Sequence, residues 1–265
     1  MGLVPIHAAG RQWGRGIENT ASHIVSSYIL TFKALAYARE KCLKPLTQAE
    51  QELLVVGMPD TKGMSPLEVM DEVEAIQQNI NKSTISQLKI LANPSKGEVL
   101  DNLRTCTVAH FACHGISDLE DPSDSCLFIG EGFDGKAGRL TIREMATVSL
   151  KRSQIAFLST CYTTEISAQE LVDEAIHVAS SFHLIGFPHV IGTMWAARDD
   201  AAIRVTSVFY KELIKSMAES GENGSHDAVA YALHSSIQAL WKVEDTGEYL
   251  TDDVISWAPF IHIGA

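Results

Sequence analysis

Short apolar runs of strand length alternate with helical segments along most of this chain, and this alternation limits the fold more than any other feature. The apolar runs lie at residues 53–57, 106–115, 154–161, 189–195 and 257–263. A run that is apolar at nearly every position is typical of a strand buried on both faces. We therefore expect an α/β fold with a mostly parallel central sheet covered by helices on both faces.

Capping patterns mark where several helices begin. The segment Ser65-Pro-Leu-Glu68 predicts a helix with Ser65 as N-cap that runs to about residue 80. Thr141 and Glu144 form a capping-box pattern that opens a short helix. Further helices are predicted over residues 22–41, 94–103, 167–184, 199–217 and 226–241, a weaker strand over 85–91 and a short edge strand over 126–129.

The composition is that of a globular protein with an acidic surface. The chain has 265 residues, of which 46% are apolar and 20% charged, so we expect one domain over residues 1–265 with an irregular N-terminal extension over about 1–50. The formal net charge is −12, with 21 basic and 33 acidic residues. An acidic chain is a poor match for the nucleic-acid backbone and for anionic membranes, so we expect neither as a partner.

Cysteine usage and the absence of long apolar runs suggest a cytoplasmic protein in a reducing environment. No apolar run approaches the roughly 20 residues of a membrane span, and the N-terminus lacks the pattern of a secretory signal. The cysteines are five in number and irregularly spaced. An odd, irregular set favours buried or functional thiols over a disulfide framework.

His114 and Cys161 are the residues in which we expect the chemistry. Each follows the end of an apolar run, with the histidine first and the cysteine 47 positions after it. Because the carboxyl ends of parallel strands share one edge of a sheet, the two side chains are expected to meet there. An imidazole beside a thiol can take its proton and create a thiolate nucleophile. The backbone N–H groups of Gly115 and Cys161 are the predicted oxyanion hole.

Two motifs around these residues resemble a known family. His110-Phe-Ala-Cys-His-Gly115 and Leu158-Ser-Thr-Cys161 are similar to the paired motifs of the CHAT family, in the caspase and separase group of cysteine peptidases. The resemblance extends, in order, to residues 5–10, 26–28, 173–179, 186–195 and 257–262. It implies a caspase-like three-layer α/β/α sandwich with a mostly parallel central sheet. It also implies a cysteine endopeptidase that uses His114 and Cys161 as a dyad and forms an acyl-enzyme.

The resemblance also points to substrate-binding residues. Trp195 and Asp199 lie in a segment similar to the family's Trp-and-Asp segment, near which separase-like relatives place an acidic group against a basic P1 side chain. The alternative is that Asp199 or Asp200 is a helix N-cap. Asp60, after the first strand, is another candidate for the pocket wall. The implied partners are a protein substrate and an upstream sensor or TPR region of the same or another chain.

These residues also allow other interpretations, a metal site and two alternative functions. His110, Cys113 and His114 suggest a zinc site, but i, i+4 spacing gathers ligands on a helix, whereas this segment is a predicted strand. Cys113 should point into the core, away from His114. We therefore expect no metal and no cofactor. The alternative functions are a catalytically silent CHAT-fold interaction module and an acyltransferase or ligase that uses the same dyad.

Overall fold

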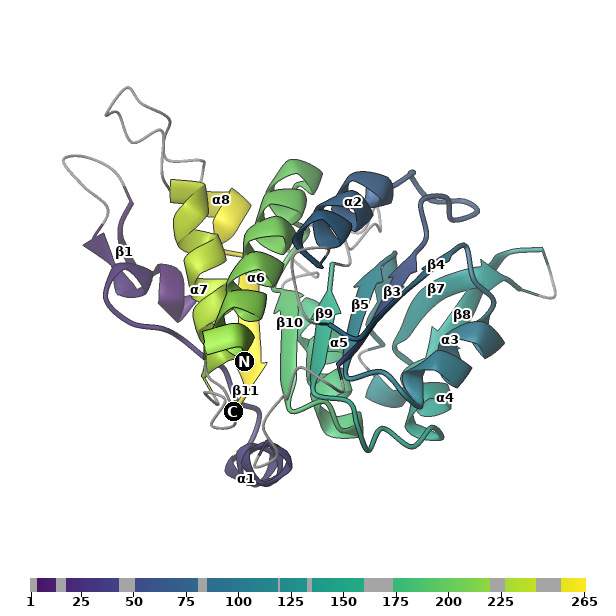
Figure 1. Ribbon diagram of the computed structural model, residues 1–265. Helices are drawn as coiled ribbons and strands as arrows, with labels where there is room; N and C mark the ends of the chain where they lie inside the picture. The colour runs from purple at the N-terminus through teal and green to yellow at the C-terminus, as the bar shows by residue number, and fades with distance from the viewer. Residues whose placement is uncertain are drawn as a thin grey trace.

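The protein is built around a six-stranded, mostly parallel sheet (Figure 1). The computed structural model describes residues 4–12, 18–42, 51–80, 85–118, 120–132, 135–159, 174–219, 227–241 and 254–265. The strand order is β11-β10-β9-β5-β3-β4, and β11 alone in this sheet runs antiparallel to its neighbour. The strands are β3 (Glu52–Gly57), β4 (Gln87–Ala92), β5 (Val108–Ala112), β9 (Ile155–Leu158), β10 (His189–Thr193) and β11 (Phe260–Gly264).

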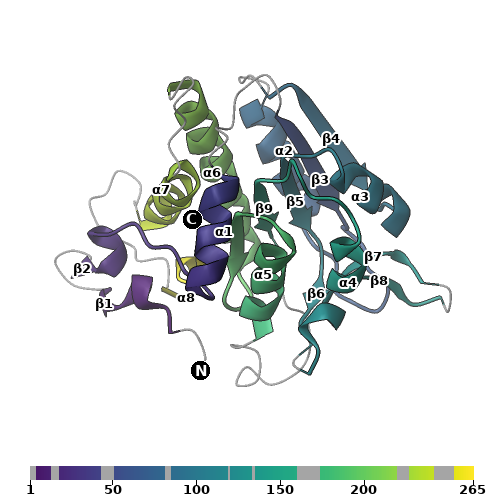
Figure 2. The ribbon, with the colours of Figure 1, turned by 90° about the horizontal axis from the view of Figure 1, so that it is seen from below.

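Helices cover both faces of this sheet, which confirms the predicted three layers (Figures 1 and 2). One face carries α2 (Val69–Ile80), α6 (Asp199–Glu219) and α7 (Ala228–Trp241), and the other carries α3 (Lys96–Leu103), α4 (Ile142–Ala146) and α5 (Glu174–Ile185). Strand β5 shows why two cores form. Val108 and Ala112 pack against α2 and α6, whereas Ala109 and Phe111 pack toward α3 and α5, because successive side chains alternate across a strand.

A second, three-stranded antiparallel sheet follows β5. It contains β6 (Gly115–Ile116), β7 (Cys126–Glu131) and β8 (Ala137–Thr141), in the order β6-β7-β8. The prediction of an edge strand over 126–129 was wrong, because β7 lies between two partners. Strand β8 was not predicted. A Cβ at its Gly138 would clash with the carbonyl oxygen of Ile129, so the close approach of β8 to β7 requires glycine at this position.

The N-terminal segment is less helical than predicted. It forms η1 (Ile6–Ala8), β1 (Gly10–Arg11), β2 (Glu18–Asn19) and η2 (Thr20–Ser22), and then α1 (Phe32–Lys41), capped by Thr31. The helix predicted over 22–41 therefore begins ten residues late. Tyr28 is extended instead, since its N–H donates to His262 O and its carbonyl accepts from Gly264 N–H at the edge of β11. Its main-chain groups stabilise the sheet edge.

Helix α2 also begins later than its capping pattern indicated, at Val69 rather than next to Ser65. Leu67 N–H donates to Pro59 O, 2.9 Å away, and Ser65 O accepts a hydrogen bond from His114. The backbone groups of Ser65 and Leu67 thus form hydrogen bonds with distant residues, and the chain is not helical before Val69. The predicted capping box of Thr141 opens α4, and α3 begins with a capping box at Ser95 that was not predicted.

The remaining elements agree with their predicted positions where the structure describes them. Residues 167–173 of the predicted helix before α5, and residues 160–161 of the predicted strand, lie outside the described residues. A short helix, α8 (Val254–Trp257), was not predicted. It includes the first residue of the strand predicted over 257–263, and that strand, β11, begins at Phe260 instead. Among the described helices, none combines the length and the apolar character needed to cross a bilayer. Four cysteines are described, and all are free and buried.

Candidate active site

His114 lies just beyond the carboxyl end of β5 and is almost fully buried, at 1% exposure. Its Nε2 is 2.8 Å from the carbonyl oxygen of Ser65, which can only accept a hydrogen bond. The neutral ring therefore carries its proton on Nε2, and the lone pair is on Nδ1. The Ser65 carbonyl orients the imidazole. Sequence reasoning missed this contact because it assigned Ser65 to a helix N-cap.

The strand that leads to Cys161 ends beside the strand that leads to His114. Strands β5 and β9 are parallel neighbours, with Phe111 opposite Leu158. Beyond this pair, Ser159 N–H donates to Phe111 O at 2.9 Å. Ser159 and His114 thus follow adjacent strands at the carboxyl edge of the sheet. Cys161, two residues after Ser159, lies outside the described residues, so its position and its N–H remain predictions.

Gly115 begins β6 with its N–H directed away from the neighbouring strand. It faces Leu127 of β7, and the adjacent hydrogen bond runs from Phe128 N–H to His114 O, 2.8 Å apart. In an antiparallel ladder, this pattern makes Gly115 and Leu127 a non-hydrogen-bonded pair. The direction of its amide is therefore compatible with the predicted role in an oxyanion hole.

A small pocket opens at this edge of the sheet. It is lined by Leu67, Glu68, Val69, Glu72, Ala112, Ser159, Asp199, Ala202 and Ile203. Of the three residues predicted to bind substrate, Asp199 lines this pocket. Trp195 is half-buried beyond the end of β10, and its Nε1–H donates to Ile255 O of α8 at 3.4 Å. Asp60 is exposed in the segment after β3. Neither is among the lining residues, so the structure does not gather the three candidates in one pocket.

The start of α6 distinguishes Asp199 from its neighbour. Ala202 N–H donates to Arg198 O, so Arg198 occupies the N-cap position and Asp199 is the first helical residue. Neither Asp199 nor Asp200 is therefore the N-cap, and that alternative was wrong. Asp200 forms a two-point ion pair with Arg198, at 2.9 and 2.7 Å. Asp199 is one of the residues that line the pocket wall.

A buried polar network lies beneath the pocket. The Glu72 carboxylate accepts hydrogen bonds from the hydroxyls of Thr206 and Ser159, and His110 Nε2 is 3.2 Å from Glu72 Oε1. Tyr210 contacts His110 Nδ1 at 3.2 Å. Sequence reasoning missed Glu72, although a signal was present. Glu72 falls on the apolar stripe of α2, next to Val73, where a charge requires a partner.

Another cysteine–histidine contact lies at the opposite edge of the sheet. Cys42 Sγ is 3.2 Å from Nε2 of His189, the first residue of β10. His189 Nδ1 is 3.0 Å from His262 Nε2, and His262 Nδ1 is 2.7 Å from Ser27 Oγ. Burial raises the pKa of the Cys42 thiol to about 11 and lowers the pKa of His262 well below its ordinary value. Both groups are therefore neutral at pH 7.

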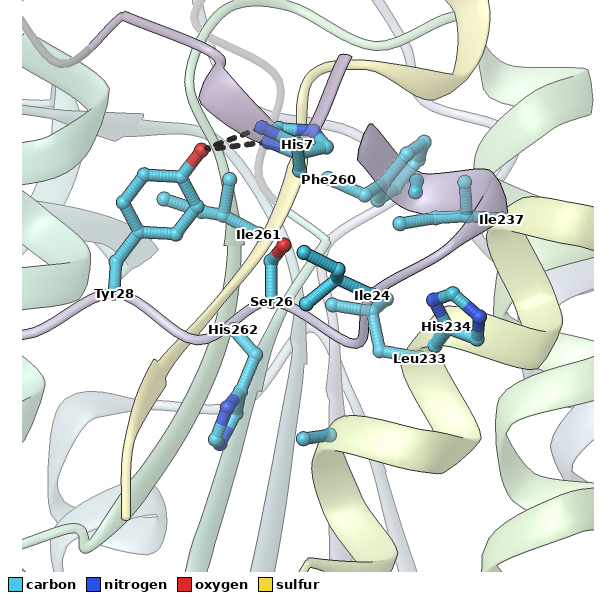
Figure 3. Close-up of a pocket in the computed structure, with 12 residues that line it drawn as sticks. His7, Ile24, Ser26, Tyr28, Leu233, His234, Ile237, Phe260, Ile261 and His262 are labelled. Carbon is cyan, nitrogen blue, oxygen red and sulfur yellow. Dashed lines mark hydrogen bonds between the residues drawn. The ribbon is translucent and has the colours of Figure 1, made fainter. Parts of the chain in front are cut away.

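Figure 3 shows a second pocket, between the N-terminal segment, α7 and β11. Apolar side chains such as Ile24, Leu233 and Phe260 make up most of its wall. His7 borders it, with Nδ1 2.7 Å from the Tyr28 hydroxyl and Nε2 2.9 Å from Ala258 O. Burial lowers the pKa of His7 to about 4. This pocket shares no residue with the pocket at the carboxyl edge.

The described residues contain no group of three or more His, Cys, Asp or Glu side chains arranged to hold a metal ion. The segment that suggested zinc is divided between the two faces of the sheet. Cys113 lies in the core with α3 to α5, as expected, whereas His110 stacks on Phe157 and contacts Tyr210 on the α6 side. These residues therefore serve packing and the buried network.

Known structures share this architecture. The Arg-specific cysteine proteinase gingipain R matches with a TM-score of 0.52 and 7% identity over 87% of this chain and 51% of its own. The complex of Porphyromonas gingivalis RgpB pro- and mature domains matches with a TM-score of 0.50 and 8% identity, over 87% of this chain and 51% of its own. The Saccharomyces cerevisiae separase–securin complex matches with a TM-score of 0.50 and 15% identity, over 90% of this chain and 14% of its own.

These likenesses show the fold alone, a caspase-like sandwich, since the identities are low. The chain spans about half the length of the gingipain chains that it matches and a small part of the separase chain. No curated protein matches the chain at a significant level. The family model of the CHAT domain matches residues 1–265, and the chain therefore belongs to the CHAT domain family.

Proposed function

We propose that this CHAT domain is a cysteine endopeptidase in which Cys161 is the nucleophile and His114 the general base. The observation that carries the proposal is the pairing of Ser159 N–H with Phe111 O. Through this bond Ser159, two residues before Cys161, pairs with the strand that precedes His114, which supports the proposed dyad. The Ser65 carbonyl on His114 Nε2 supports the same assignment, because it leaves Nδ1 as the basic nitrogen.

The reaction follows from these groups. His114 Nδ1 takes the proton of the Cys161 thiol, and the thiolate attacks the scissile carbonyl carbon. The N–H groups of Gly115 and Cys161 donate to the oxyanion of the tetrahedral intermediate. The imidazolium of His114 then protonates the leaving amine as the C–N bond breaks. Water, deprotonated by His114, finally attacks the thioester and releases the acid together with the Cys161 thiol.

Asp199 supports a preference for a basic P1 side chain. Its carboxyl group lines the pocket next to Ser159, together with Glu68 and Glu72, so the wall carries acidic groups from two helices. A Lys or Arg side chain of the substrate would complement that charge. Gingipain R is named as Arg-specific. In this proposal, Trp195 and Asp60 contact more distant parts of the substrate, outside the pocket lining.

The proposal includes a cellular setting. The substrate is a protein cleaved in an extended segment, and residues 1–265 act as one peptidase domain, with a TPR or sensor region upstream as its regulator. The four described cysteines are free and buried, which supports a reducing, cytoplasmic location.

The test is labelling by a peptide electrophile with a basic P1 residue. We expect selective, stoichiometric modification of Cys161 at neutral pH, located by peptide mass mapping, and no modification in Cys161→Ala. Profiling a peptide pool by mass then separates the alternatives. Hydrolysis yields free acids, and an acyltransferase yields new amides when an amine is supplied. Labelling of all thiols at one rate, with no cleavage, would leave the interaction module as the function.

A further inference from the structure

Glu72 on α2 is a buried carboxylate that takes no part in the proposed chemical steps, although it adds negative charge to the pocket wall. Its side chain is 6% exposed, and it lies among the apolar residues of α2 that face the sheet. A charged group in such a place persists only when hydrogen bonds and opposite charges compensate for lost hydration. The identity of its partners therefore indicates what it does.

Three elements supply those partners. Thr206 of α6 and Ser159 at the end of β9 donate their hydroxyls to the carboxylate, and His110 of β5 places Nε2 3.2 Å from Oε1. The His110 contact is an ion-pair distance without good hydrogen-bond geometry. Burial alone would raise the pKa of Glu72, but His110 and the hydrogen bonds outweigh it and lower the pKa. Glu72 is therefore a carboxylate at neutral pH.

Two of these partners lie on the strands that lead to the proposed dyad. His110 precedes His114 by four residues along β5, and Ser159 precedes Cys161 by two residues. One carboxylate thus contacts both strands at the edge where they end. Thr206 is different, because it lies in the second turn of α6 and leads to neither dyad residue.

We infer that Glu72 is a positioning residue that holds the end of β9, and through it Cys161, in place relative to the strand that carries His114. This inference rests on the proposed function. Loss of the Ser159–Glu72 hydrogen bond would let the end of β9 shift against β5. A displacement of about 1 Å between reacting groups is enough to slow catalysis by about 100-fold.

The experiment compares Ser159→Ala with Thr206→Val as its matched control. Both remove one hydroxyl from the same carboxylate, but only Ser159 lies on the strand leading to Cys161. We expect Ser159→Ala to lower kcat by about 10-fold or more with little change in KM. Thr206→Val should lower the Tm and keep kcat within about 3-fold. The inference would be overturned if kcat fell equally in both variants, or if it fell in neither.

A double-mutant cycle supplies the second test. If Glu72 acts through Ser159, Glu72→Gln combined with Ser159→Ala should be no slower than Glu72→Gln alone. Additive losses of kcat would contradict the inference. If Glu72→Gln does not fold, the comparison of Ser159→Ala with Thr206→Val decides the matter.

Alkylation of Cys161 by iodoacetamide at pH 7, measured without substrate, separates this inference from the proposed function. If both hold, Cys161 reacts faster than an ordinary thiol in the wild type and in Thr206→Val, but more slowly in Ser159→Ala. A fast Cys161 with equal rates in all three proteins overturns the inference and leaves the peptidase proposal intact. An unreactive Cys161 in the wild type, together with no cleavage, overturns both.

Discussion

The central sheet has a cysteine–histidine contact at its amino edge and the proposed dyad at its carboxyl edge, and the two edges differ in what surrounds them. At the amino edge, Cys42 contacts His189 directly at 3.2 Å. At the carboxyl edge, Ser159, at the strand end before Cys161, lines a pocket with an acidic wall, and His114 follows the neighbouring strand. The first pair is visible in the structure as a contact, whereas the second is a proposal from topology, sequence and family.

The difference teaches that proximity alone does not make a catalytic dyad. Cys42 is 6% exposed, and burial raises its thiol pKa to about 11, so it is protonated at pH 7. The two nitrogens of His189 already contact Cys42 and His262. These groups neither reach a substrate nor hold a thiolate, and they tie α1 to β10 and β11. A reactive thiol requires an accessible surface and groups that favour its anion.

The largest difference between the two edges should appear when each thiol is removed in turn. Cys161→Ala should reduce peptide hydrolysis by at least about 1000-fold, because the nucleophile is lost. Cys42→Ala should keep kcat/KM within about 3-fold and lower stability by about 1 kcal/mol, because it deletes a buried contact. Initial rates on the best peptide and chemical denaturation measure both. Loss of activity in Cys42→Ala with its stability intact would reverse the assignment.

Thiol reactivity gives the next largest contrast. At pH 8, a thiol with a pKa of about 11 is about 0.1% ionised, and burial limits access further. Cys42 should therefore react with iodoacetamide at least about 100-fold more slowly than Cys161. Quantitative mass spectrometry of the native protein, with the unfolded protein as control, follows each cysteine. Equal rates in the native protein would show that the two edges are chemically alike.

Acid should affect the stability of the N-terminal segment and the amino edge. Burial lowers the pKa of His7 to about 4 and that of His262 well below its ordinary value, so the folded state binds fewer protons than the unfolded chain below pH 6.5. Stability is then complete above pH 6.5 and falls as the pH decreases toward 4, by up to about 3 kcal/mol for His7. Urea denaturation at several pH values measures this.

The matched variant for that measurement is His7→Gln, which removes the titrating ring that contacts Tyr28 and Ala258. It should be less stable than the wild type at pH 7 and lose less stability between pH 6.5 and 4. Identical pH dependence in both proteins would exclude His7 as a source of acid sensitivity.

The smallest expected effect concerns the pocket wall. Asp199→Asn should raise KM about 10-fold for substrates with a basic P1 residue and leave a neutral P1 substrate unchanged, because only the charge is removed. Asp200→Asn is the control, since Asp200 is paired with Arg198 outside the pocket lining. If both variants behave alike, the preference does not arise in this pocket.

Much of the fold was predictable from the sequence because it follows from local pattern. The buried strands β3, β5, β9 and β10 are nearly continuous apolar runs, and the capping box at Thr141 marks a helix start. The errors occurred where tertiary hydrogen bonds replaced local ones. The backbone at Ser65 binds His114 rather than a helical turn, and Tyr28 pairs with β11 rather than joining α1.

The alternation of strands and helices, and the positions of His114 and Cys161 after two apolar runs, follow from the sequence alone. The reason is that hydrophobic period and chain order are properties of the chain. Only the tertiary structure decided that β5 and β9 are neighbours and that Ser65 orients His114. It also decided that Glu72 lies beneath both strands, and that Cys42 contacts His189. These contacts join residues far apart in the chain, and no local pattern specifies which distant groups will compensate a buried charge.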